Sequence, residues 1–202
     1  MKKSAALLMG ILFILALGIF SQEKEITEYQ GQKLTPLRNQ KTTHIEEPPE
    51  VDLSAYRLKI EGKVRQPLEL RYEEVLALPQ ESKVITMNCV EGWNYRALWT
   101  GIKISDLIAQ AQHEPEAKTV IFYAIGGKYS SVLPLETIKE KKILLAFKVN
   151  NITLPPERGF PFMVVAEEKY GYKWVEKIVL SDKEYKGYWE KRGYSNKADI
   201  RK

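Results

Sequence analysis

The sequence predicts an α+β fold that is mainly β, with mixed sheets and short helices. Short apolar or alternating segments recur along the chain from Tyr56 onward, which is typical of many short strands. Turn pairs such as Gly126-Gly127 and Asn150-Asn151 stand between several of these segments. Helical spacing occurs only in brief stretches, which argues against the regular strand and helix alternation of a Rossmann fold.

The length of the chain suits one folded unit. A chain of 202 residues with 44% hydrophobic residues can bury one sizeable core and leaves little room for a second domain. We expect this domain to span residues 51–202. Residues 22–50 are polar and aperiodic and include Pro48-Pro49, which predicts a tether whose last part can wrap the domain.

Residues 1–21 have the pattern of a signal peptide or an amino-terminal membrane anchor. Lys2 and Lys3 precede an uncharged segment from Ala5 to Phe20, after which charged residues return. The small residues of a cleavage site are poorly represented, so cleavage and retention as an anchor both stay open. Because lysines favour the cytoplasmic side, the rest of the chain is expected to be exported, either membrane-anchored or periplasmic or extracellular.

The first half of the expected domain mixes strand and helix patterns. Alternating spacing predicts strands over residues 56–60 and 83–87, and helical spacing predicts helices over residues 72–78 and 107–111. Pro79 ends the first helix, and Ser105 is the expected cap of the second.

The second half is mainly β. Strands are expected over residues 119–124, 129–133, 143–149, 152–154, 162–166 and 175–180. Gly126-Gly127 separates the first two and Asn150-Asn151 the next two, and both residue types tolerate the positive φ of a tight turn. Each of these two pairs therefore predicts a hairpin.

The single cysteine, Cys89, follows a predicted strand and precedes the turn residues Glu91-Gly92. One cysteine excludes an intramolecular disulfide, the usual use of cysteine in exported proteins. From this residue alone, a buried small hydrophobe, a reactive thiol and a metal ligand all stay open. His44 and His113 are far apart, which argues against a His-rich zinc site or a bis-histidine haem.

The charge of the chain gives little indication of a partner. The formal charge is +5 at pH 7, and Lys2 and Lys3 of the expected leader contribute two of these charges. Such a small excess does not indicate binding to nucleic acid.

Several motifs in register point to a family. They are CVEGW, WTG, SDL, LPPERGFP, KYGYK and GYWEKRGY, at residues 89–93, 99–101, 105–107, 154–161, 169–173 and 187–194. Their order and spacing resemble the molybdopterin-binding domain of the sulfite oxidase superfamily. Within it, the chain is similar to the catalytic subunit of the bacterial protein-methionine-sulfoxide reductase.

The resemblance implies a sulfite oxidase-like molybdopterin-binding fold and a bound molybdenum cofactor. In that family the cysteine at the Cys89 position gives the one protein bond to molybdenum, so Cys89 is the expected metal ligand and catalytic residue. Glu91 would lie near the metal as a catalytic acid or hydrogen-bond acceptor, or would be a solvated turn carboxylate. Asn88 would contact the cofactor at a position where near relatives often carry a basic residue.

The phosphate of the pterin needs cations and backbone N–H groups. The resemblance places Arg158 and Lys173 at the cofactor, with Tyr170, Gly171 and Tyr172 forming the wall of its site. The alternative is structural: the two tyrosines would pack on one face of a strand, and Lys173 would be solvated.

Three positions depart from the family pattern. The similar reductase subunit has arginine, lysine and threonine where this chain has Met163, Glu176 and Ala124. The loss of two cations and the gain of one acid weaken a phosphate site. A cofactor-free binding or scaffold module that keeps the fold is therefore the alternative function.

The leading prediction is an extracytoplasmic molybdopterin-dependent oxidoreductase that performs oxygen-atom or two-electron transfer on a small oxo compound. The sequence shows no haem site and no second cluster. We therefore expect a separate electron-transfer partner, by analogy a membrane-bound cytochrome or quinone-linked protein. The substrate, the direction of the reaction and the oligomeric state are left open by the sequence.

Overall fold

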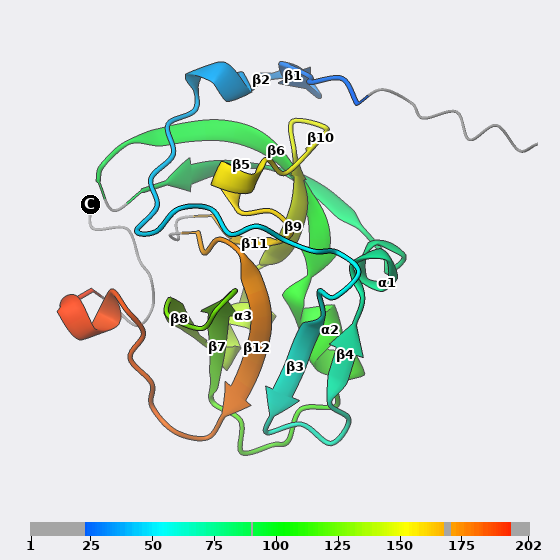
Figure 1. Ribbon diagram of the computed structural model, residues 1–202, viewed down its shortest axis with the longest axis vertical. Coiled ribbons are helices and arrows are strands. Elements are labelled where there is room, and N and C mark those ends of the chain that lie inside the picture. The colour runs from blue at the N-terminus through cyan, green and yellow to red at the C-terminus, as the bar shows by residue number, and fades with distance from the viewer. Residues whose placement is uncertain (1–22, 90, 168–170, 195–202) are drawn as a thin grey trace, which may run out of the picture.

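The computed structural model describes residues 23–89, 91–167 and 171–194, in which two five-stranded sheets form the body of the molecule (Figure 1). The first sheet has the order β10-β9-β6-β5, with β11 also paired to β9. Its strands are β5 (Glu81–Asn88), β6 (Asn94–Lys103), β9 (Leu144–Val149), β10 (Ile152–Thr153) and β11 (Met163–Val165).

The second sheet has the order β4-β3-β12-β7-β8. Its strands are β3 (Leu58–Gly62), β4 (Leu68–Leu70), β7 (Thr119–Ala124), β8 (Ser130–Pro134) and β12 (Val175–Ser181). β12 is parallel to β3, whereas it is antiparallel to β7. The short helices are α1 (Tyr72–Leu76), α2 (Ile104–Gln110) and α3 (Leu135–Glu140). The prediction of a mainly β fold with mixed sheets and short helices is confirmed.

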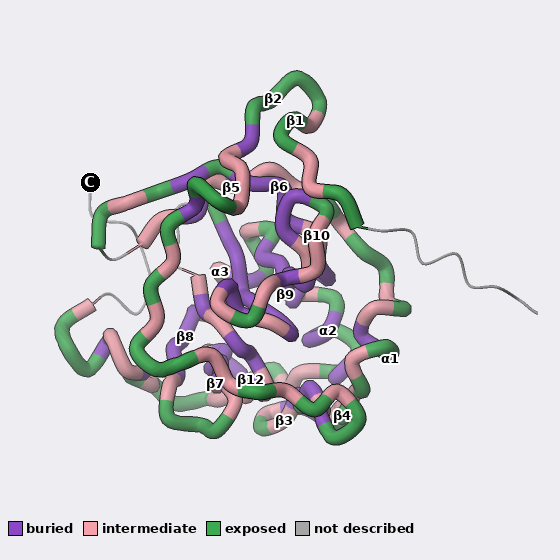
Figure 2. The backbone as a smooth tube through the Cα atoms, turned by 45° about the horizontal axis from the view of Figure 1, so that its top comes forward, coloured by how far each residue is buried: buried purple, intermediate pink, exposed green. Residues whose placement is uncertain are grey.

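The main hydrophobic core joins the second sheet to parts of the first and to the helices. Ile60, Phe122 and Ile178 of the second sheet and Leu145 of β9 are buried in one cluster with Leu107 of α2. The buried residues concentrate on the strands in Figure 2, and exposed residues concentrate on the connections. Because the helices contribute apolar faces to this core, their short lengths are stabilised by packing rather than by helix propensity.

The two predicted hairpins form around the expected turns. Gly126 and Gly127 have φ of 79° and 71°, and they connect β7 to β8. Asn150 and Asn151 have φ of 48° and 70°, and they connect β9 to β10. Asn150 is fully buried, and its side chain accepts a hydrogen bond from the Leu98 N–H at 3.1 Å. The turn therefore also connects β9 to β6.

Some elements differ from the sequence-based expectation. The ten-residue strand β6 was not predicted, because its buried run Ala97–Trp99 lacks simple alternation. Helix α2 begins at Ile104, so Ser105 lies inside the helix and the cap position belongs to Lys103. The expected Ser105 cap is wrong because the residue before Ile104 is still held in the β6 ladder, where Lys103 pairs with Leu144.

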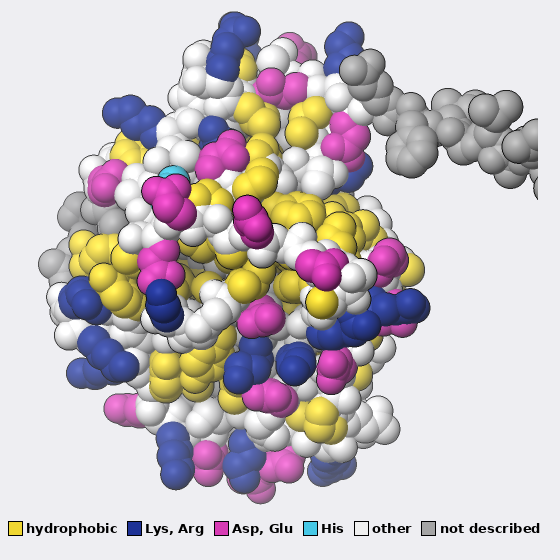
Figure 3. Space-filling model, in the orientation of Figure 1, with side chains coloured by type: hydrophobic (Ala, Val, Ile, Leu, Met, Phe, Trp, Pro, Cys, Tyr) yellow, Lys and Arg dark blue, Asp and Glu magenta, His cyan; other side chains and the backbone are white. Residues whose placement is uncertain are grey.

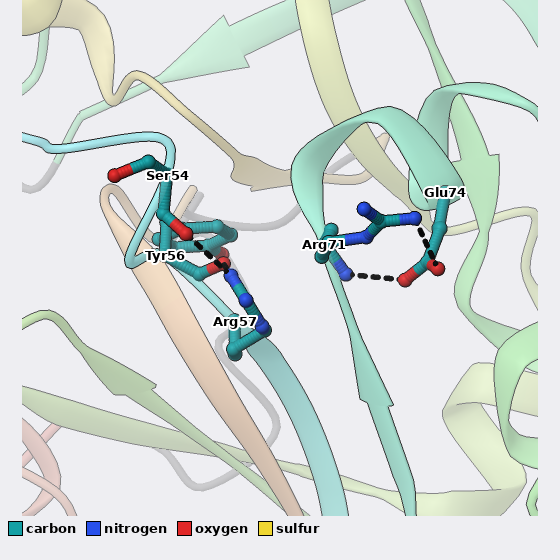
Figure 4. Close-up of polar contacts among 5 residues, drawn as sticks. All are labelled: Ser54, Tyr56, Arg57, Arg71 and Glu74. Atoms are coloured by element: carbon teal, nitrogen blue, oxygen red, sulfur yellow. Dashed lines mark hydrogen bonds and ion pairs between the residues drawn. The ribbon is translucent and has the colours of Figure 1, made fainter.

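The start of helix α1 is fixed by a local polar contact (Figure 4). The Arg71 N–H donates to Glu74 Oε2 at 2.8 Å, and the Arg71 guanidinium donates to Glu74 Oε1 at 3.0 Å. Nearby, Arg57 Nη1 donates to the Ser54 carbonyl at 2.9 Å just before β3. These contacts satisfy polar groups at element ends that lack partners inside the helix or sheet.

Residues 23–50, the described part of the predicted tether (residues 22–50), lie against the domain along much of their length. They include β1 (Glu28–Tyr29), β2 (Gln32–Lys33) and the 3-10 turn η1 (Leu37–Asn39). The Ile26 N–H donates to the Asn150 carbonyl at 3.0 Å, and the Thr35 N–H donates to the Arg96 carbonyl at 2.8 Å. Backbone hydrogen bonds of this kind leave no periodic signal in the sequence. The domain start at residue 51 stays a prediction.

The predicted leader, residues 1–21, lies outside the described residues. Within the described ranges, no helix is both long and apolar enough to span a membrane. Lysine, arginine and acidic side chains are interspersed on the face shown in Figure 3. Such mixing is ordinary for a solvated surface.

Candidate cofactor site

A cavity of about 180 Å³ lies where residues of both sheets meet. Its wall includes Asn88 at the end of β5, Cys89 directly after it, Ala124 of β7 and Met163 of β11. Residues 41–47, which we call the strap, supply another side of the cavity from Thr42 onward. In Figure 1 the strap belongs to the light-blue to cyan connection between η1 and β3.

Cys89 is partly buried at the wall of this cavity. Its N–H donates to the Trp93 carbonyl at 3.0 Å, and its carbonyl accepts from the Gly92 N–H at 3.0 Å. Gly92 has φ of 85°, a left-handed conformation that lets the chain reverse directly after the thiol. Burial raises the pKa of the thiol, although hydrogen bonds with Glu91 and Thr43 oppose this effect. A soft metal ion would remove the thiol proton on binding.

Glu91 lies exposed beside the cavity rather than in its described wall. Its Oε2 accepts hydrogen bonds from Thr43 Oγ1 at 2.8 Å and from Trp93 Nε1 at 3.0 Å. The hydrogen bond from Thr43, then that from Trp93, lowers the pKa of Glu91. In this structure the carboxylate connects the turn after Cys89 to the strap. Its predicted catalytic role stays a prediction.

Asn88 lines the cavity, as the resemblance implied. Its Nδ2 donates to the Thr86 carbonyl at 3.0 Å, which fixes the amide along the strand edge. The carbonyl oxygen of the amide remains the group that could accept a hydrogen bond from a bound molecule.

Lys173 lies in the wall of the cavity and holds the strap in place. Its Nζ donates to Thr42 Oγ1, to the Thr43 carbonyl at 2.8 Å and to the Glu157 carbonyl at 2.9 Å. Burial, followed by the charge of Arg158, lowers the pKa of Lys173 to about 8. The three hydrogen bonds use all three protons of the ammonium group. The solvated alternative for Lys173 is therefore wrong, whereas its contact with a cofactor stays a prediction.

Arg158 lies behind the cavity wall rather than in it. It ends the turn η2 (Pro156–Arg158), and only 6% of the residue is exposed. Its Nη2 donates to the carbonyls of Leu37 and Gln40, each at 2.8 Å. Its Nη1 is buried and has no hydrogen-bond partner among the described residues. The side chain thus positions the segment that leads into the strap.

Replacing Arg158 by methionine should release that segment. One buried carbonyl, of Gln40, and one partly buried carbonyl, of Leu37, would lose a charged donor. Each such loss costs roughly 1.5 to 3 kcal/mol, so we expect about 3 kcal/mol of lost stability. Urea unfolding would measure the loss, and amide hydrogen exchange would locate it at residues 37–40. The control is Arg38→Met, since Arg38 is exposed on η1. Unchanged exchange of residues 37–40 in Arg158→Met would contradict the assigned role.

Of the three predicted wall residues, the structure describes Gly171 and Tyr172. Gly171 and Tyr172 line the cavity, and Tyr172 stacks on Phe122 with ring centroids 5.6 Å apart. A Cβ on Gly171 would lie 2.5 Å from Met163 Cε and 2.9 Å from Met87 Cε, so a side chain there would displace the flexible ends of these two methionines. Tyr170 lies outside the described residues.

The three departures from the family pattern occupy different places. Met163 and Ala124 line the cavity, so both bear on what it holds. Glu176 is half-buried on β12 and is not among the described wall residues. Of the two cations of the family pattern that this chain lacks, only the one at Met163 is therefore missing from the described wall of the cavity.

Some wall residues were not singled out from the sequence. The strap contributes Thr42, Thr43 and His44, and the carboxyl-terminal segment contributes Tyr188, Trp189 and Glu190. The second group lies in the GYWEKRGY motif, which was a signal for the site. The strap residues gave no such signal, because they lie in a polar segment and reach the cavity only through tertiary contacts.

Comparison with known proteins decides the family. The family described as oxidoreductase molybdopterin binding domain matches residues 44–189. The chain belongs to this family. The predicted resemblance is thereby confirmed, and the protein is a molybdopterin-binding oxidoreductase.

Two curated relatives agree with this assignment. The uncharacterized oxidoreductase YuiH of Bacillus subtilis (strain 168) is 32% identical over 152 residues, covering 73% of this chain and 76% of YuiH. The putative protein-methionine-sulfoxide reductase subunit YedZ1 of Azospira oryzae is 30% identical over 149 residues, covering 72% of this chain and 56% of that protein.

A solved structure supports the fold. The sulfane dehydrogenase SoxCD from Paracoccus pantotrophus matches with a TM-score of 0.66 and 24% identity. The match covers 70% of this chain and 42% of that chain. At this identity the likeness supports the sulfite oxidase-like fold alone, and no activity is inferred from it.

The residues of the cavity fit the cofactor of this family. No three His, Cys, Asp or Glu side chains group closely enough in the described parts of the chain to hold a metal ion alone. A metal at Cys89 would thus need most of its ligands from a cofactor, as molybdopterin provides. His44 Nδ1 and Glu190 Oε2 belong to wall residues and are buried without a hydrogen-bond partner among described residues. Such atoms can pair with the polar edge of a heterocycle.

Proposed function

We propose that this protein is an extracytoplasmic oxidoreductase in which Cys89 binds molybdenum and a small oxo compound is the substrate. The single observation that carries the proposal is the partly buried Cys89 thiol at the wall of the cavity, in a chain of the molybdopterin-binding family. A lone thiol placed there suits a soft metal ion that receives its other sulfur ligands from a cofactor.

The residues of the chain would position the reaction rather than perform its electron chemistry. The cofactor, when bound, supplies oxygen-atom and two-electron transfer. Cys89 would hold the metal at the wall, and the strap, fixed by Lys173 and Glu91, would close one side and restrict water. In the reductive direction the oxo compound accepts two electrons and two protons, loses its oxygen and releases one water molecule.

Export and a separate electron-transfer partner complete the proposal. The uncharged segment after Lys2 and Lys3 supports export, and the lone cysteine is compatible with an oxidising compartment. A separate electron-transfer partner, by analogy membrane-bound, would supply or remove the electrons. It is supported by a relative that is named as a subunit, the putative YedZ1.

The test is the metal and pterin content of the full chain, produced in cells with an active cofactor pathway. We expect about one molybdenum and one pterin per chain, measured by elemental analysis and by fluorescence of the oxidised pterin. The loaded protein should also oxidise a reduced viologen dye when a small oxo compound is added. A folded protein with neither molybdenum nor pterin would refute the proposal and favour a cofactor-free scaffold.

A further inference from the structure

A surface segment near the carboxyl end combines basic and aromatic side chains. Residues 185–194 contain one acid, Glu190, which is buried. Three exposed cations and three partly exposed aromatic residues surround it in the sequence. At the left edge of the otherwise mixed face in Figure 3, over the red turn η3 (Glu190–Arg192) of Figure 1, hydrophobic and basic side chains gather. We call these six residues the basic aromatic face: Lys186, Tyr188, Trp189, Lys191, Arg192 and Tyr194.

The rings of this face pack into one group. The ring centroid of Trp189 lies 5.2 Å from that of Tyr188 and 5.2 Å from that of Tyr194, both in edge-to-face arrangements. The guanidinium carbon of Arg192 lies 3.6 Å from the centroid of the Tyr188 ring, and its Nη1 donates to the Tyr188 carbonyl at 2.7 Å. Stacking of this kind holds a cation over an aromatic ring. The cation and the rings therefore form a continuous surface.

The segment that carries the face is fixed against β8. The Tyr188 N–H donates to the Ser130 carbonyl at 2.8 Å, and Ser131 Oγ donates to Glu190 Oε1 at 2.5 Å. A Cβ on Gly187 would lie 2.2 Å from the Ser130 carbonyl oxygen, so the two backbones approach too closely for a side chain there. A surface that is already ordered loses little conformational entropy when it binds a partner.

The cations of the face have no acidic partner among the described residues. No salt bridge within those ranges involves Lys186, Lys191 or Arg192. The preceding residues 182–184, DKE, add one net negative charge against these three positive charges. The face therefore keeps a positive excess that can attract an anionic surface.

This combination of side chains is typical of proteins that rest on a bilayer. Tryptophan and tyrosine rings settle at the headgroup level, because each has an apolar body and a polar tip. Lysine and arginine are attracted to the negative surface of anionic lipids. Figure 1 shows η3 projecting outward from the two sheets, so a flat lipid surface can reach the face.

The predicted leader favours a lipid surface over an acidic protein as the partner. If residues 1–21 stay in the membrane, they hold the domain next to a bilayer at a high effective concentration. A face of moderate intrinsic affinity then suffices for contact with the lipid. An acidic protein would have to reach the same face by diffusion.

We infer that the basic aromatic face binds an anionic lipid surface, with its cations on the lipid phosphates and Trp189 at the headgroup level. This inference goes beyond the proposed function and needs no bound cofactor. Tyr188, Trp189 and Tyr194 also line the cavity. Binding would therefore bring the cavity close to the membrane surface.

The test measures contact between tryptophan and lipid on the full chain. Vesicles of phosphatidylglycerol or phosphatidylcholine carry bromine on their acyl chains, which quenches tryptophan fluorescence on contact. Residues 1–21 contain no tryptophan, so the quenching reports the rest of the chain whether or not the leader is retained. We expect at least about threefold stronger quenching on phosphatidylglycerol, lost in 1 M salt, where the Debye length is about 3 Å. Equal quenching on the two lipids would overturn the inference.

The cations are tested by a triple variant, Lys186→Gln, Lys191→Gln and Arg192→Gln. Its quenching on phosphatidylglycerol should fall to the level on phosphatidylcholine, because the attraction to the anionic surface is removed. The matched control removes two lysines and one arginine that are exposed on or next to β3 and β7 and form no salt bridge among the described residues. These changes are Lys59→Gln, Arg65→Gln and Lys118→Gln. An equal loss in the control would show that net charge decides, and would contradict a localised face.

The ring in contact with lipid is identified by two single variants. Trp189→Phe should remove most of the quenching, whereas Trp174→Phe should retain it. Trp174 also lines the cavity, but it is only 8% exposed. The pair therefore separates exposure to the outer surface from exposure to the cavity. Quenching that survives in Trp189→Phe would place the lipid contact elsewhere and overturn the inference.

A lysine footprint on the wild type distinguishes the possible anions and carries the test if the triple variant does not fold. An amine-reactive reagent labels Lys186 and Lys191, and mass spectrometry reads the extent of labelling. Phosphatidylglycerol vesicles should lower it at least about threefold, and inorganic phosphate at the same phosphate concentration should leave it unchanged. Equal protection by inorganic phosphate would indicate a site for small anions. Protection by polyglutamate but not by vesicles would indicate an acidic protein, and either result overturns the inference.

Discussion

Cys89→Ser should abolish molybdenum binding and leave the fold intact. A serine hydroxyl stays protonated near neutral pH and is a hard donor, whereas a thiolate is a soft donor suited to this metal. Serine is slightly smaller, and Cys89 is only partly buried at a cavity, so the free energy of unfolding should change by less than about 1 kcal/mol. Elemental analysis gives the metal content, and circular dichroism with urea unfolding checks the fold.

Met87→Leu is the control for this experiment. Met87 also lines the cavity with a sulfur atom, but its thioether has no proton to lose and cannot become a thiolate. The exchange conserves volume and should cost less than about 1.5 kcal/mol. We expect normal molybdenum content in Met87→Leu. Equal molybdenum in the wild type and Cys89→Ser would rule out Cys89 as the metal ligand.

Gly101→Ala should destabilise the domain more than any other change considered so far. Gly101 lies on β6 at the irregularity where the pairing with β9 shifts register. A Cβ there would lie 2.4 Å from the Leu145 carbonyl oxygen and 2.6 Å from the Ala146 Cα. These are backbone atoms of β9, so relief requires the two strands to separate. We expect a loss of at least about 3 kcal/mol, at or above the upper end for overpacked cores.

Gly127→Ala is the control for Gly101→Ala, because it introduces the cost of a left-handed φ without a steric clash. Gly127 has φ of 71°, but a Cβ there would meet nothing within 4 Å. Its cost should be the left-handed penalty alone, roughly 1 to 2 kcal/mol. Urea unfolding of both variants gives the comparison. A Gly101→Ala cost no larger than that of Gly127→Ala would mean that β6 and β9 can move apart easily.

The local features of the sequence were sufficient to predict much of the second sheet and its turns. β7 spans the residues expected from their apolar run, and Gly126-Gly127 forms the expected turn. These predictions succeeded because the information is short-range: side-chain alternation and positive φ are both properties of adjacent residues. The motif order around Cys89 was similarly sufficient to predict the family, which residues 44–189 confirm.

The sequence could not predict β6 or the conformation of the strap. β6 lies between β5 and β9, and its buried run Ala97–Trp99 interrupts the alternation of exposed and buried residues that begins at Asn94, so no continuous alternating pattern marks the strand. The strap is held by polar contacts to Lys173, Glu91 and Glu157. Its sequence therefore has no periodic spacing of apolar residues that would predict its conformation. These contacts join residues separated by 48 to 131 positions, and no local pattern records them.

The sequence by itself determined the fold class, the family and the thiol suited to a metal, because each depends on residue identity at short or fixed spacing. Only the tertiary structure decided which charges face the cavity. It places Arg158 behind the wall, engages Lys173 with the strap and leaves the buried Glu190 Oε2 without a partner among the described residues. The physical reason is that hydrogen bonding and burial, which set the effective charge of a side chain, depend on neighbours brought together by folding.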